Sequence, residues 1–362
     1  MFESQPSPEK YQELAFEQAK QESAFALPQP ELNQELELEN IPTIFKNSLF
    51  VEHLESQEKN GSRTVVITDV DRTFWLKDQP ELSQKLSSVL EKTGIPLIYC
   101  SGRDIGGLEG NLPNGDAVMA AVGTELYVRQ QDGALKKDGS FAEFLQSEGW
   151  RAEAVHQIIS NFIADKPELQ WQPGYEISDP NQRPEKARQE FKISLFFSPS
   201  DNLSIEKVSE ELNKLLPSGA GVVISTNYHL ENSYFIDFLP KVDHTVGKAL
   251  AILYLKKFFP IHTIVAGDSG NDLSMMLESD SDAILVGNAL PEALEKVRTI
   301  PSIKERERIK FYKGDNRDHA IYIGDPREDG PKAIASALGR GDFNPQIAPF
   351  VKTLSIEAGL IV

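Results

Sequence analysis

The chain has 362 residues, 40% of them hydrophobic, and carries a formal net charge of −18. That length predicts two or three domains with a buried core, and the negative charge argues against a nucleic-acid surface, which needs clustered lysine and arginine. The single cysteine, Cys100, excludes an intrachain disulfide, and the lack of closely spaced histidine pairs argues against a zinc site.

The first 62 residues form an acidic extension, with twelve glutamates against five lysines and arginines up to Arg63. The favoured interpretation is a partly ordered extension that packs loosely, within which apolar residues at near-helical intervals allow a helix over residues 8–26, and a second apolar patch, residues 41–54, is expected to pack on the following domain. The N-terminus lacks a signal or transit pattern, and no apolar run approaches the roughly 18–20 residues of a membrane span. We therefore expect a soluble, cytoplasmic protein without membrane association.

From residue 64 onward, short apolar runs alternate with amphipathic stretches such as residues 81–94. The runs that predict strands are residues 64–68, 95–100, 117–123, 262–267 and 283–287. Continuous apolar strands that alternate with helices are typical of a parallel sheet covered by helices on both faces. The fold class predicted for this part is α/β, with a Rossmann-like parallel-sheet core.

Residues 141–239 interrupt this rhythm. Helical patterns at 141–167 and 204–216 occur beside alternating, strand-like segments at 190–197, 221–227 and 234–240. Such a pattern indicates antiparallel strands with helices on one side, an α+β domain inserted into the core. The predicted parts are the extension (1–62), the core in two pieces (63–140 and 240–342), the inserted domain (141–239) and a C-terminal tail (343–362).

Acidic residues follow two of the predicted strands. Asp69 and Asp71 follow the first strand, and Asp268 and Asp272 lie in the segment GDSGND after the strand at 262–267. In an extended chain residues i and i+2 point to the same side, and ligands bind at the carboxyl ends of parallel strands. Four carboxylates there predict a site for Mg²⁺, which prefers oxygen ligands. Taken singly, each segment is also compatible with an ordinary turn.

Ser101 and Lys248 are candidates for phosphate binding. Ser101 follows the strand at 95–100 and can donate a hydroxyl hydrogen bond, and Lys248 begins an apolar helical stretch and can bring an ammonium to the same anion. Helix N-terminal N–H groups would add to the attraction. The alternatives are a simple turn at Ser101 and an exposed lysine at a helix start.

Together these segments resemble the haloacid dehalogenase superfamily of phosphotransferases. The four motifs occur in the family's order, and the insertion lies between the second and third, as in members with a large α+β cap. The matching segments are DVDRT (69–73), Ser101 with Gly102 and Arg103, Lys248, and GDSGND (267–272). The resemblance covers residues 64–342 and implies the haloacid dehalogenase fold with an inserted α+β cap domain.

The resemblance also implies roles for individual residues. Asp69 would be the nucleophile that forms an aspartyl-phosphate, and Asp71 the general acid and base. The residues implied at the phosphate are Thr73, Ser101 and Lys248. Those implied at Mg²⁺ are Asp69, the Asp71 backbone carbonyl, Asp268 and Asp272, with Asn271 and Asn288 as supports of the loop.

A finer resemblance is to sucrose-phosphate phosphatases and related sugar-phosphate phosphatases. It is carried by VGTELYV (122–128), residues 167–186, EFKISLFF (190–197) and DFLPKVDHTVGKAL (237–250). It implies hydrolysis of a sugar phosphate, with sucrose 6-phosphate as the expected substrate and Arg103, Gln182 and Lys192 as substrate-binding residues. Arg72 and the acidic extension depart from the family pattern. Mannosylfructose phosphate, a glucosylglycerol-type phosphate or another glycosyl phosphate therefore stay open as substrates.

Other functions fit the sequence less well. A P-loop is excluded because Gly247-Lys248 is followed by Ala249, and Cys100 and Arg103 are too close for a cysteine-phosphatase loop. The main alternative of another class is a non-catalytic partner of a sugar-phosphate synthase, and a phosphomutase is a further one. The motif carboxylates are all present, which favours catalysis, and nothing in the sequence suggests a second phosphate clamp, which favours hydrolysis over a mutase.

Overall fold

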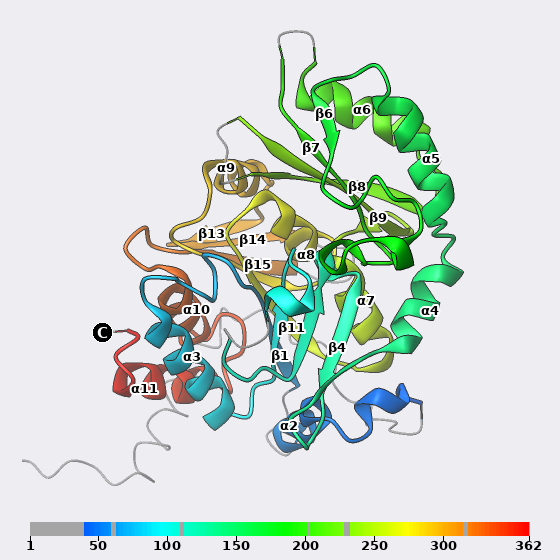
Figure 1. Ribbon diagram of the computed structural model, residues 1–362. Helices are drawn as coiled ribbons and strands as arrows, with labels where there is room; N and C mark the ends of the chain where they lie inside the picture. Colours follow the sequence, from blue (N-terminus) through cyan, green and yellow to red (C-terminus); the bar gives the residue numbers. More distant parts are fainter. Residues whose placement is uncertain are drawn as a thin grey trace, which may run out of the picture.

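The computed structural model describes residues 40–58, 63–108, 112–200, 203–227, 232–313 and 318–361 (Figure 1). The helix predicted for residues 8–26 lies outside these ranges. The helices are α2 (Leu49–Glu58), α3 (Pro80–Lys92), α4 (Gly139–Ser147), α5 (Ala152–Ile163), α6 (Ile205–Leu215), α7 (Ala249–Phe258), α8 (Leu273–Leu277), α9 (Pro291–Thr299), α10 (Gly330–Leu338) and α11 (Ala348–Glu357). The strands are β1 (Thr64–Asp69), β2 (Leu97–Cys100), β3 (Ala117–Ala120), β4 (Glu125–Arg129), β5 (Leu135–Lys137), β6 (Leu169–Trp171), β7 (Ile193–Phe197), β8 (Ala220–Thr226), β9 (Tyr234–Val242), β10 (Thr245–Val246), β11 (His262–Gly267), β12 (Asp282–Leu285), β13 (Lys304–Arg306), β14 (Ile309–Lys313) and β15 (Asp318–Ile323). No helix within the described ranges has the length and apolarity that crossing a bilayer requires.

The main sheet has the strand order β13-β14-β15-β12-β11-β1-β2-β3-β4-β5. The six strands from β15 to β3 run parallel, as the sequence predicts for the core. At the two edges, β4 and β5 and also β13 and β14 continue the sheet with antiparallel pairing. β1 and β11 therefore lie in the middle of the sheet, where both faces are covered.

Each face of the main sheet has its own apolar core. Val65 and Ile67 of β1 belong to a cluster that includes side chains of α2, α4 and α7. Val66, between them, points to the opposite face and packs with α3, α10 and α11. All six residues of β1 are buried, which explains why this strand lacks polar alternation.

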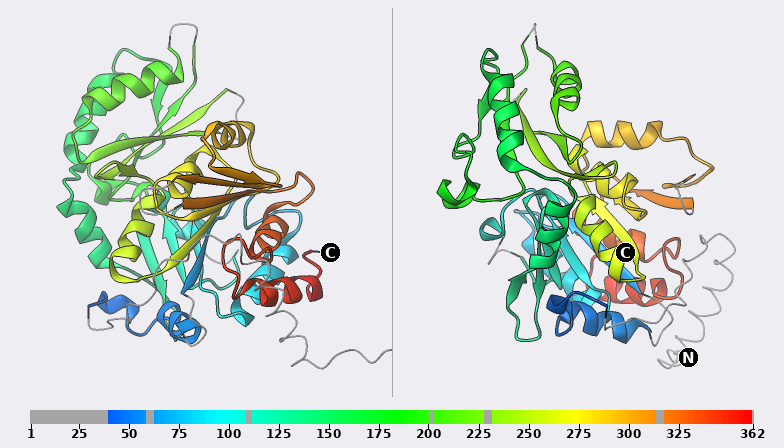
Figure 2. Two further views of the ribbon diagram at one scale, coloured as in Figure 1. Left: turned by 180° about the vertical axis from the view of Figure 1, so that it is seen from behind. Right: turned by 90° about the vertical axis from the view of Figure 1, so that its right-hand side faces the viewer.

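The two ends of the described chain both pack on this core. Phe45 and Phe50 contact each other and Phe259 edge-on. The side-chain amide of Gln57 donates a hydrogen bond to the Thr64 carbonyl and accepts one from the Thr64 backbone N–H. Residues 41–54 thus pack on the core as expected, and Figure 2 shows α2 (blue) at the end away from the green inserted segment. At the other end, α11 packs against α3 and α10.

A second, antiparallel sheet lies between β5 and α7 in the chain. Its order is β10-β9-β7-β6, with β8 paired to β9 on the other side from β7. The strands β6, β7 and β8 and the helices α5 and α6 lie within residues 141–239, where the sequence predicts an α+β insertion, while α4 begins before this range, β9 extends beyond it and β10 lies after it. In Figure 1 this segment (green) is stacked at one end of the main sheet, with α5 on its outer side.

Candidate active site

The polar residues at the strand ends converge because their strands are neighbours in register. β1 pairs in parallel with β11, with Thr68 opposite Ala266, so Asp69 and Asp268 leave the sheet side by side. On its other side β1 pairs with β2, with Asp69 opposite Cys100, which brings the next residue, Ser101, to the same edge. The carboxyl edge of the sheet thus gathers side chains from three distant segments.

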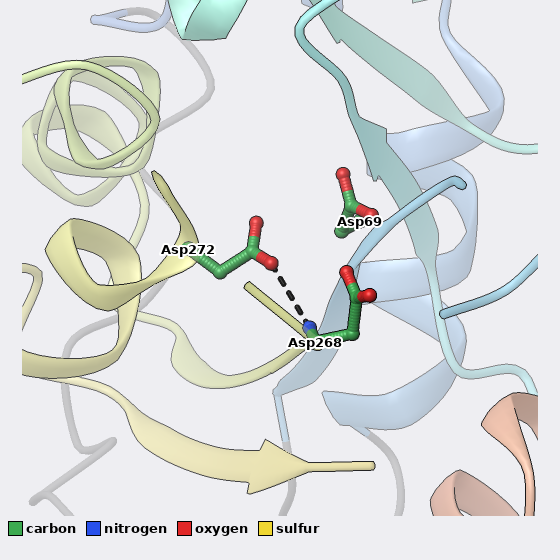
Figure 3. Close-up of side chains that lie close together, drawn as sticks. All are labelled: Asp69, Asp268 and Asp272. Carbon is green, nitrogen blue, oxygen red and sulfur yellow. Dashed lines mark hydrogen bonds between the residues drawn. The ribbon is translucent and has the colours of Figure 1, made fainter. Parts of the chain in front are cut away.

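Asp69, Asp268 and Asp272 form a compact buried group, hereafter the carboxylate cluster (Figure 3). Each offers a carboxylate oxygen within 4.8 Å of those of the other two. Lys248 is 1% exposed, and its Nζ lies 2.5 Å from Asp69 Oδ1 and 2.5 Å from Asp272 Oδ1. One ammonium therefore bridges two of the three carboxylates.

Both carboxylate oxygens of Asp272 are engaged within the protein. Oδ2 accepts the backbone N–H groups of Asp268 at 2.9 Å and Ser269 at 3.0 Å, while Oδ1 accepts Lys248 Nζ (Figure 3 shows the bond to Asp268). The loop is tight at its start, because a Cβ on Gly267 would lie 2.4 Å from the Asp272 Cβ. Asp272 thus holds both Asp268 and Lys248 in position.

The carboxylate cluster places three acidic groups around one buried cation, so that their ionised forms repel each other. Burial raises the pKa of Asp69 to about 7, against the attraction of Lys248, and burial with repulsion from Asp272 and Asp69 raises that of Asp268 to about 8. Burial works to lower the pKa of Lys248, but the neighbouring Asp272 and Asp69 outweigh it and raise the pKa well above its ordinary value. Lys248 therefore stays an ammonium, and one further positive charge would be stabilised here.

The donor set fits a hard divalent cation. Carboxylate oxygens are the ligands that such ions prefer, and the carboxylate cluster offers three of them close together. Asp69 and Asp268 are the residues that would hold the ion. Asp272 accepts the buried Lys248 ammonium and two backbone N–H groups, and would support the ion through Asp268. The partners of Asp268 itself are the half-exposed Arg72 and, at 3.5 Å, the Thr73 hydroxyl.

Two glycines allow the backbone to bring Lys248 to the cluster. Gly247 has a φ of +79°, a left-handed conformation that glycine adopts without strain, immediately before Lys248 and α7. Gly123, in the VGTE segment, approaches so closely that a Cβ there would lie 2.7 Å from the Lys248 Cα. A larger residue at either position would move the ammonium.

Arg72, which departs from the family pattern, has a partner that the sequence does not reveal. Its Nε donates to Asp268 Oδ2 at 3.0 Å and its Nη2 donates to the Asn288 carbonyl at 3.0 Å. Asn288 Nδ2 in turn donates to the Arg72 carbonyl at 2.7 Å. Thr73 is buried, and its hydroxyl lies 3.5 Å from Asp268 Oδ1. The first motif and the Asp268 loop are therefore tied together by these contacts.

Asp71 lies on the solvent-facing side of the site. Its Oδ1 is 2.6 Å from Arg103 Nη2, and the two side chains are 42% and 54% exposed. Ser101 is buried, and its Oγ accepts the Arg103 backbone N–H at 3.1 Å. Ser101 therefore fixes the Arg103 backbone, while the exposed ion pair with Asp71 is screened by water and separates at little cost.

In the second sheet, Lys192 is part of a buried polar group with Ser194 and Asp237, hereafter the Lys192 group. Lys192 Nζ lies 3.2 Å from Asp237 Oδ1, and the Ser194 hydroxyl donates a short hydrogen bond to the same oxygen. Sequence reasoning identified Lys192 and missed Asp237. The signal for Asp237 is a charged residue inside the otherwise apolar stretch YFIDFL.

The Lys192 group faces the core of the protein next to the carboxylate cluster. Asp237 lies opposite Ser194 on β7 and opposite Val223 on β8, so the three side chains share one face of the second sheet. Val223 packs on the core, because a Cβ on Gly247 would lie 3.1 Å from its Cγ2. Since Gly247 precedes Lys248, this face turns toward the site.

Two predicted residues lie apart from the cluster. Gln182 is exposed on the inserted segment, and its amide donates to Asp179 Oδ2 at 2.9 Å. Asn271 stays within the GDSGND loop, where its Oδ1 accepts the Ser269 hydroxyl at 2.9 Å. The structure does not bring Gln182 to the cluster, and it gives Asn271 a supporting position.

The Sucrose-6F-phosphate phosphohydrolase family matches residues 62–318 of this chain. Among curated relatives, the probable sucrose-phosphatase 3a of Arabidopsis thaliana is 27% identical over 253 residues, covering 64% of this chain and 52% of that protein. A putative HAD-like hydrolase of Nitrosococcus oceani is also 27% identical over 253 residues, covering 66% and 63%. The chain thus spans between half and two thirds of the length of these relatives.

Among solved structures, the sucrose-phosphatase of Synechocystis sp. PCC6803, determined in complex with sucrose and phosphate, has a TM-score of 0.56 to this chain. The two are 22% identical, over 78% of this chain and 99% of that one. This likeness confirms the predicted α/β fold class. The family match covers well over half of the chain and includes all four motifs, as the resemblance predicted. The chain therefore belongs to the Sucrose-6F-phosphate phosphohydrolase family, within the haloacid dehalogenase superfamily.

Proposed function

We propose that the protein is a Mg²⁺-dependent phosphatase that hydrolyses a sugar phosphate, with sucrose 6-phosphate as the first candidate. The observation that carries the proposal is a buried carboxylate cluster, bridged by Lys248, beside the inward-facing Lys192 group. The family membership and the sucrose-bound structure of the Synechocystis relative support the substrate class. We place the reaction in the cytoplasm, where the buried thiol of Cys100 stays reduced.

Asp69 acts as the nucleophile. One of its carboxylate oxygens attacks the phosphorus, and the bond from phosphorus to the sugar oxygen breaks as the aspartyl-phosphate forms. Lys248 orients Asp69 and offsets charge on the transferred group, and Thr73 and Ser101 donate to phosphoryl oxygens. Mg²⁺, when bound at Asp69 and Asp268, supplies further positive charge at the phosphoryl group.

Asp71 acts first as the acid and then as the base. It gives its proton to the leaving sugar oxygen, and it then takes a proton from the water that attacks phosphorus and releases Asp69. Because Arg103 is paired with Asp71 in this structure, that exposed ion pair opens before Asp71 takes up its role. Arg103 then binds the substrate.

The inserted domain, residues 141–239, acts as a cap between the core pieces 63–140 and 240–342. The Lys192 group recognises sugar hydroxyls, since it presents a cation and hydrogen-bonding oxygens on the face that turns toward the site. Gln182 contributes only when the cap closes, because it lies apart from the cluster here. Closure excludes water other than the attacking molecule.

The test is a panel of sugar phosphates and simple phosphate esters, assayed with Mg²⁺ for phosphate release. We expect the highest kcat/KM with sucrose 6-phosphate and no turnover in EDTA. A preference for another glycosyl phosphate would leave the phosphatase activity in place and change the assigned substrate. Turnover that survives chelation would contradict the dependence on Mg²⁺. No release from any ester would favour a non-catalytic partner of a sugar-phosphate synthase.

A further inference from the structure

Arg183 is a fully buried cation in the inserted segment. It is 1% exposed and is the largest of the fully buried side chains in the described part of the chain. Its guanidinium donates to five backbone carbonyls and forms no ion pair with a carboxylate within the described ranges, while Asp179 and Glu176 favour its charge from farther away. Burying a guanidinium without a carboxylate is unfavourable unless many acceptors surround it. The surrounding backbone is therefore arranged around this side chain.

The five acceptors come from both ends of one irregular segment. At one end, Nε donates to the Ile177 carbonyl at 2.7 Å and Nη2 donates to the Ser178 carbonyl at 3.2 Å. At the other end, Nη1 donates to the carbonyls of Ala187 at 3.5 Å, Gln189 at 3.4 Å and Lys192 at 3.2 Å. One side chain thus joins the start and the end of the segment.

Residues 172–192, between β6 and β7, contain little regular structure that could hold them in place. They form two short 3₁₀ turns, Pro180–Gln182 and Glu185–Ala187. The Tyr175 ring lies 5.2 Å from the Arg183 Cζ, and its hydroxyl donates a short hydrogen bond to Gln189. The guanidinium and this ring are therefore the centre around which the segment folds.

The segment leads directly into the Lys192 group. It ends at Lys192, whose carbonyl accepts from Arg183 and whose ammonium pairs with Asp237. Tyr175 of the segment is buried, and burial together with the negative charge of Asp237 raises its pKa. A shift of the segment would therefore displace Lys192 at the edge of the site.

We propose that Arg183 is a positioning residue that fixes residues 175–192 as the rim of the substrate site and thereby sets affinity for the part of the substrate beyond the phosphate. This role rests on the proposed function. Arg183 takes no part in phosphoryl transfer, because its guanidinium is enclosed by carbonyls of its own segment.

A kinetic comparison of two substrates tests this role. Arg183→Met removes all five donor bonds while keeping much of the side-chain volume. We expect kcat/KM for the preferred sugar phosphate to fall at least about tenfold, mainly through KM, with p-nitrophenyl phosphate hydrolysis within about twofold of the parent. Arg183→Lys keeps the charge with fewer donors and should give an intermediate KM. Lys214→Met, an exposed cation on α6 outside this segment, is the matched control and should change the hydrolysis of neither substrate.

Hydrogen exchange tests the positioning itself, without any substrate. In Arg183→Met, amides of residues 175–192 should exchange at least about tenfold faster, with those of β1 and β11 unchanged. Unchanged exchange in the segment would overturn the proposal, as would equal losses on both substrates, which indicate general damage. A parent protein that hydrolyses p-nitrophenyl phosphate and no sugar phosphate would overturn the proposed substrate class. The exchange result would still decide whether Arg183 fixes the segment.

Discussion

Two groups of acidic side chains lie at opposite ends of β11, and they differ in how their charge is offset. At the amino end, His262 Nε2 lies 2.8 Å from Asp282 Oδ2, and Asp282 Oδ1 accepts the Ala320 N–H at 2.9 Å. His319 Nε2 lies 2.8 Å from Asp280 Oδ1, so two histidines accompany two aspartates there. At the carboxyl end, the carboxylate cluster has Lys248 as its buried cation.

The difference separates a structural use of buried charge from a chemical one. Asp282 has a hydrogen-bond partner on each oxygen, so its charge stabilises the start of the neighbouring strands. The carboxylate cluster gathers three acidic groups around one buried cation, and it lies at the edge where ligands bind in parallel sheets. Substitutions in the first group should therefore change stability, whereas those in the second should change activity.

The largest effect is expected from Asp69→Asn. Loss of the nucleophile should lower kcat at least about 10³-fold, while Tm stays the same or rises, because a buried charge is removed. Steady-state kinetics with thermal melts of the same samples would measure both. Asp165→Asn, whose side chain is 84% exposed, is the matched control and should change neither. Near-parental activity of Asp69→Asn would refute the assignment of Asp69 as the nucleophile.

Lys248→Met should damage activity and stability together. It leaves Asp69 and Asp272 without their shared ammonium, which should lower kcat/KM at least about 100-fold and the free energy of unfolding by about 3–5 kcal/mol. Urea unfolding and phosphate release would be compared with Lys257→Met, an exposed lysine on the same helix. A variant as stable as the parent would show that Lys248 is not the main offset of the cluster's charge.

Asp282→Asn should have the opposite signature to Asp69→Asn. A neutral amide cannot replace both interactions of this buried carboxylate, so the free energy of unfolding should fall by about 2 kcal/mol. The parental kcat should be retained within about twofold below the unfolding transition, because the group lies at the far end of the strands. Loss of activity without loss of stability would contradict the structural role.

The smallest expected effect is a pH dependence of the increase in Tm that Mg²⁺ produces. The raised pKa values of Asp69 and Asp268, about 7 and about 8, mean that the folded, metal-free cluster favours protonated acids. Without metal, the cluster therefore lowers stability as the pH rises from the ordinary aspartate pKa, near 4, toward about 8. Mg²⁺ binds the ionised form, so its increase of Tm should be larger at about pH 8 than at about pH 6. Equal increases at both pH values would contradict these shifts.

The central strands could be predicted from sequence because burial on both faces makes them continuous apolar runs. β1 and β11 match the predicted ranges within one residue. The antiparallel edge strands β13 and β14 could not, since the stretch KERERIKFYK has the charge density of an exposed loop. Pairing at the edge of a sheet depends on which strand lies nearby in the folded protein, and this cannot be read from the local sequence.

For the site, the sequence predicts which residues lie at the strand ends, but it does not predict which side chains form hydrogen bonds and ion pairs with one another. Asp69 and Asp268 follow recognisable strands, so their convergence follows from parallel pairing. The bond from Arg72 to Asp268, the pairing of Asp237 with Lys192, and the carbonyl shell of Arg183 depend on tertiary distances. Gln182 illustrates the opposite case: the family resemblance implies that it binds substrate, and in the structure it lies apart from the cluster and bonds to Asp179.

Chemical trapping of the phosphorylated residue tests the central claim most directly. The protein would be mixed with Mg²⁺ and its preferred sugar phosphate, quenched in acid and treated with borohydride, which reduces an aspartyl-phosphate to homoserine. Peptide mass spectrometry should then find homoserine at position 69, dependent on substrate and missing from Asp69→Asn. Phosphate release with an unmodified Asp69, or homoserine at position 268 or 272 instead, would contradict the proposed chemistry.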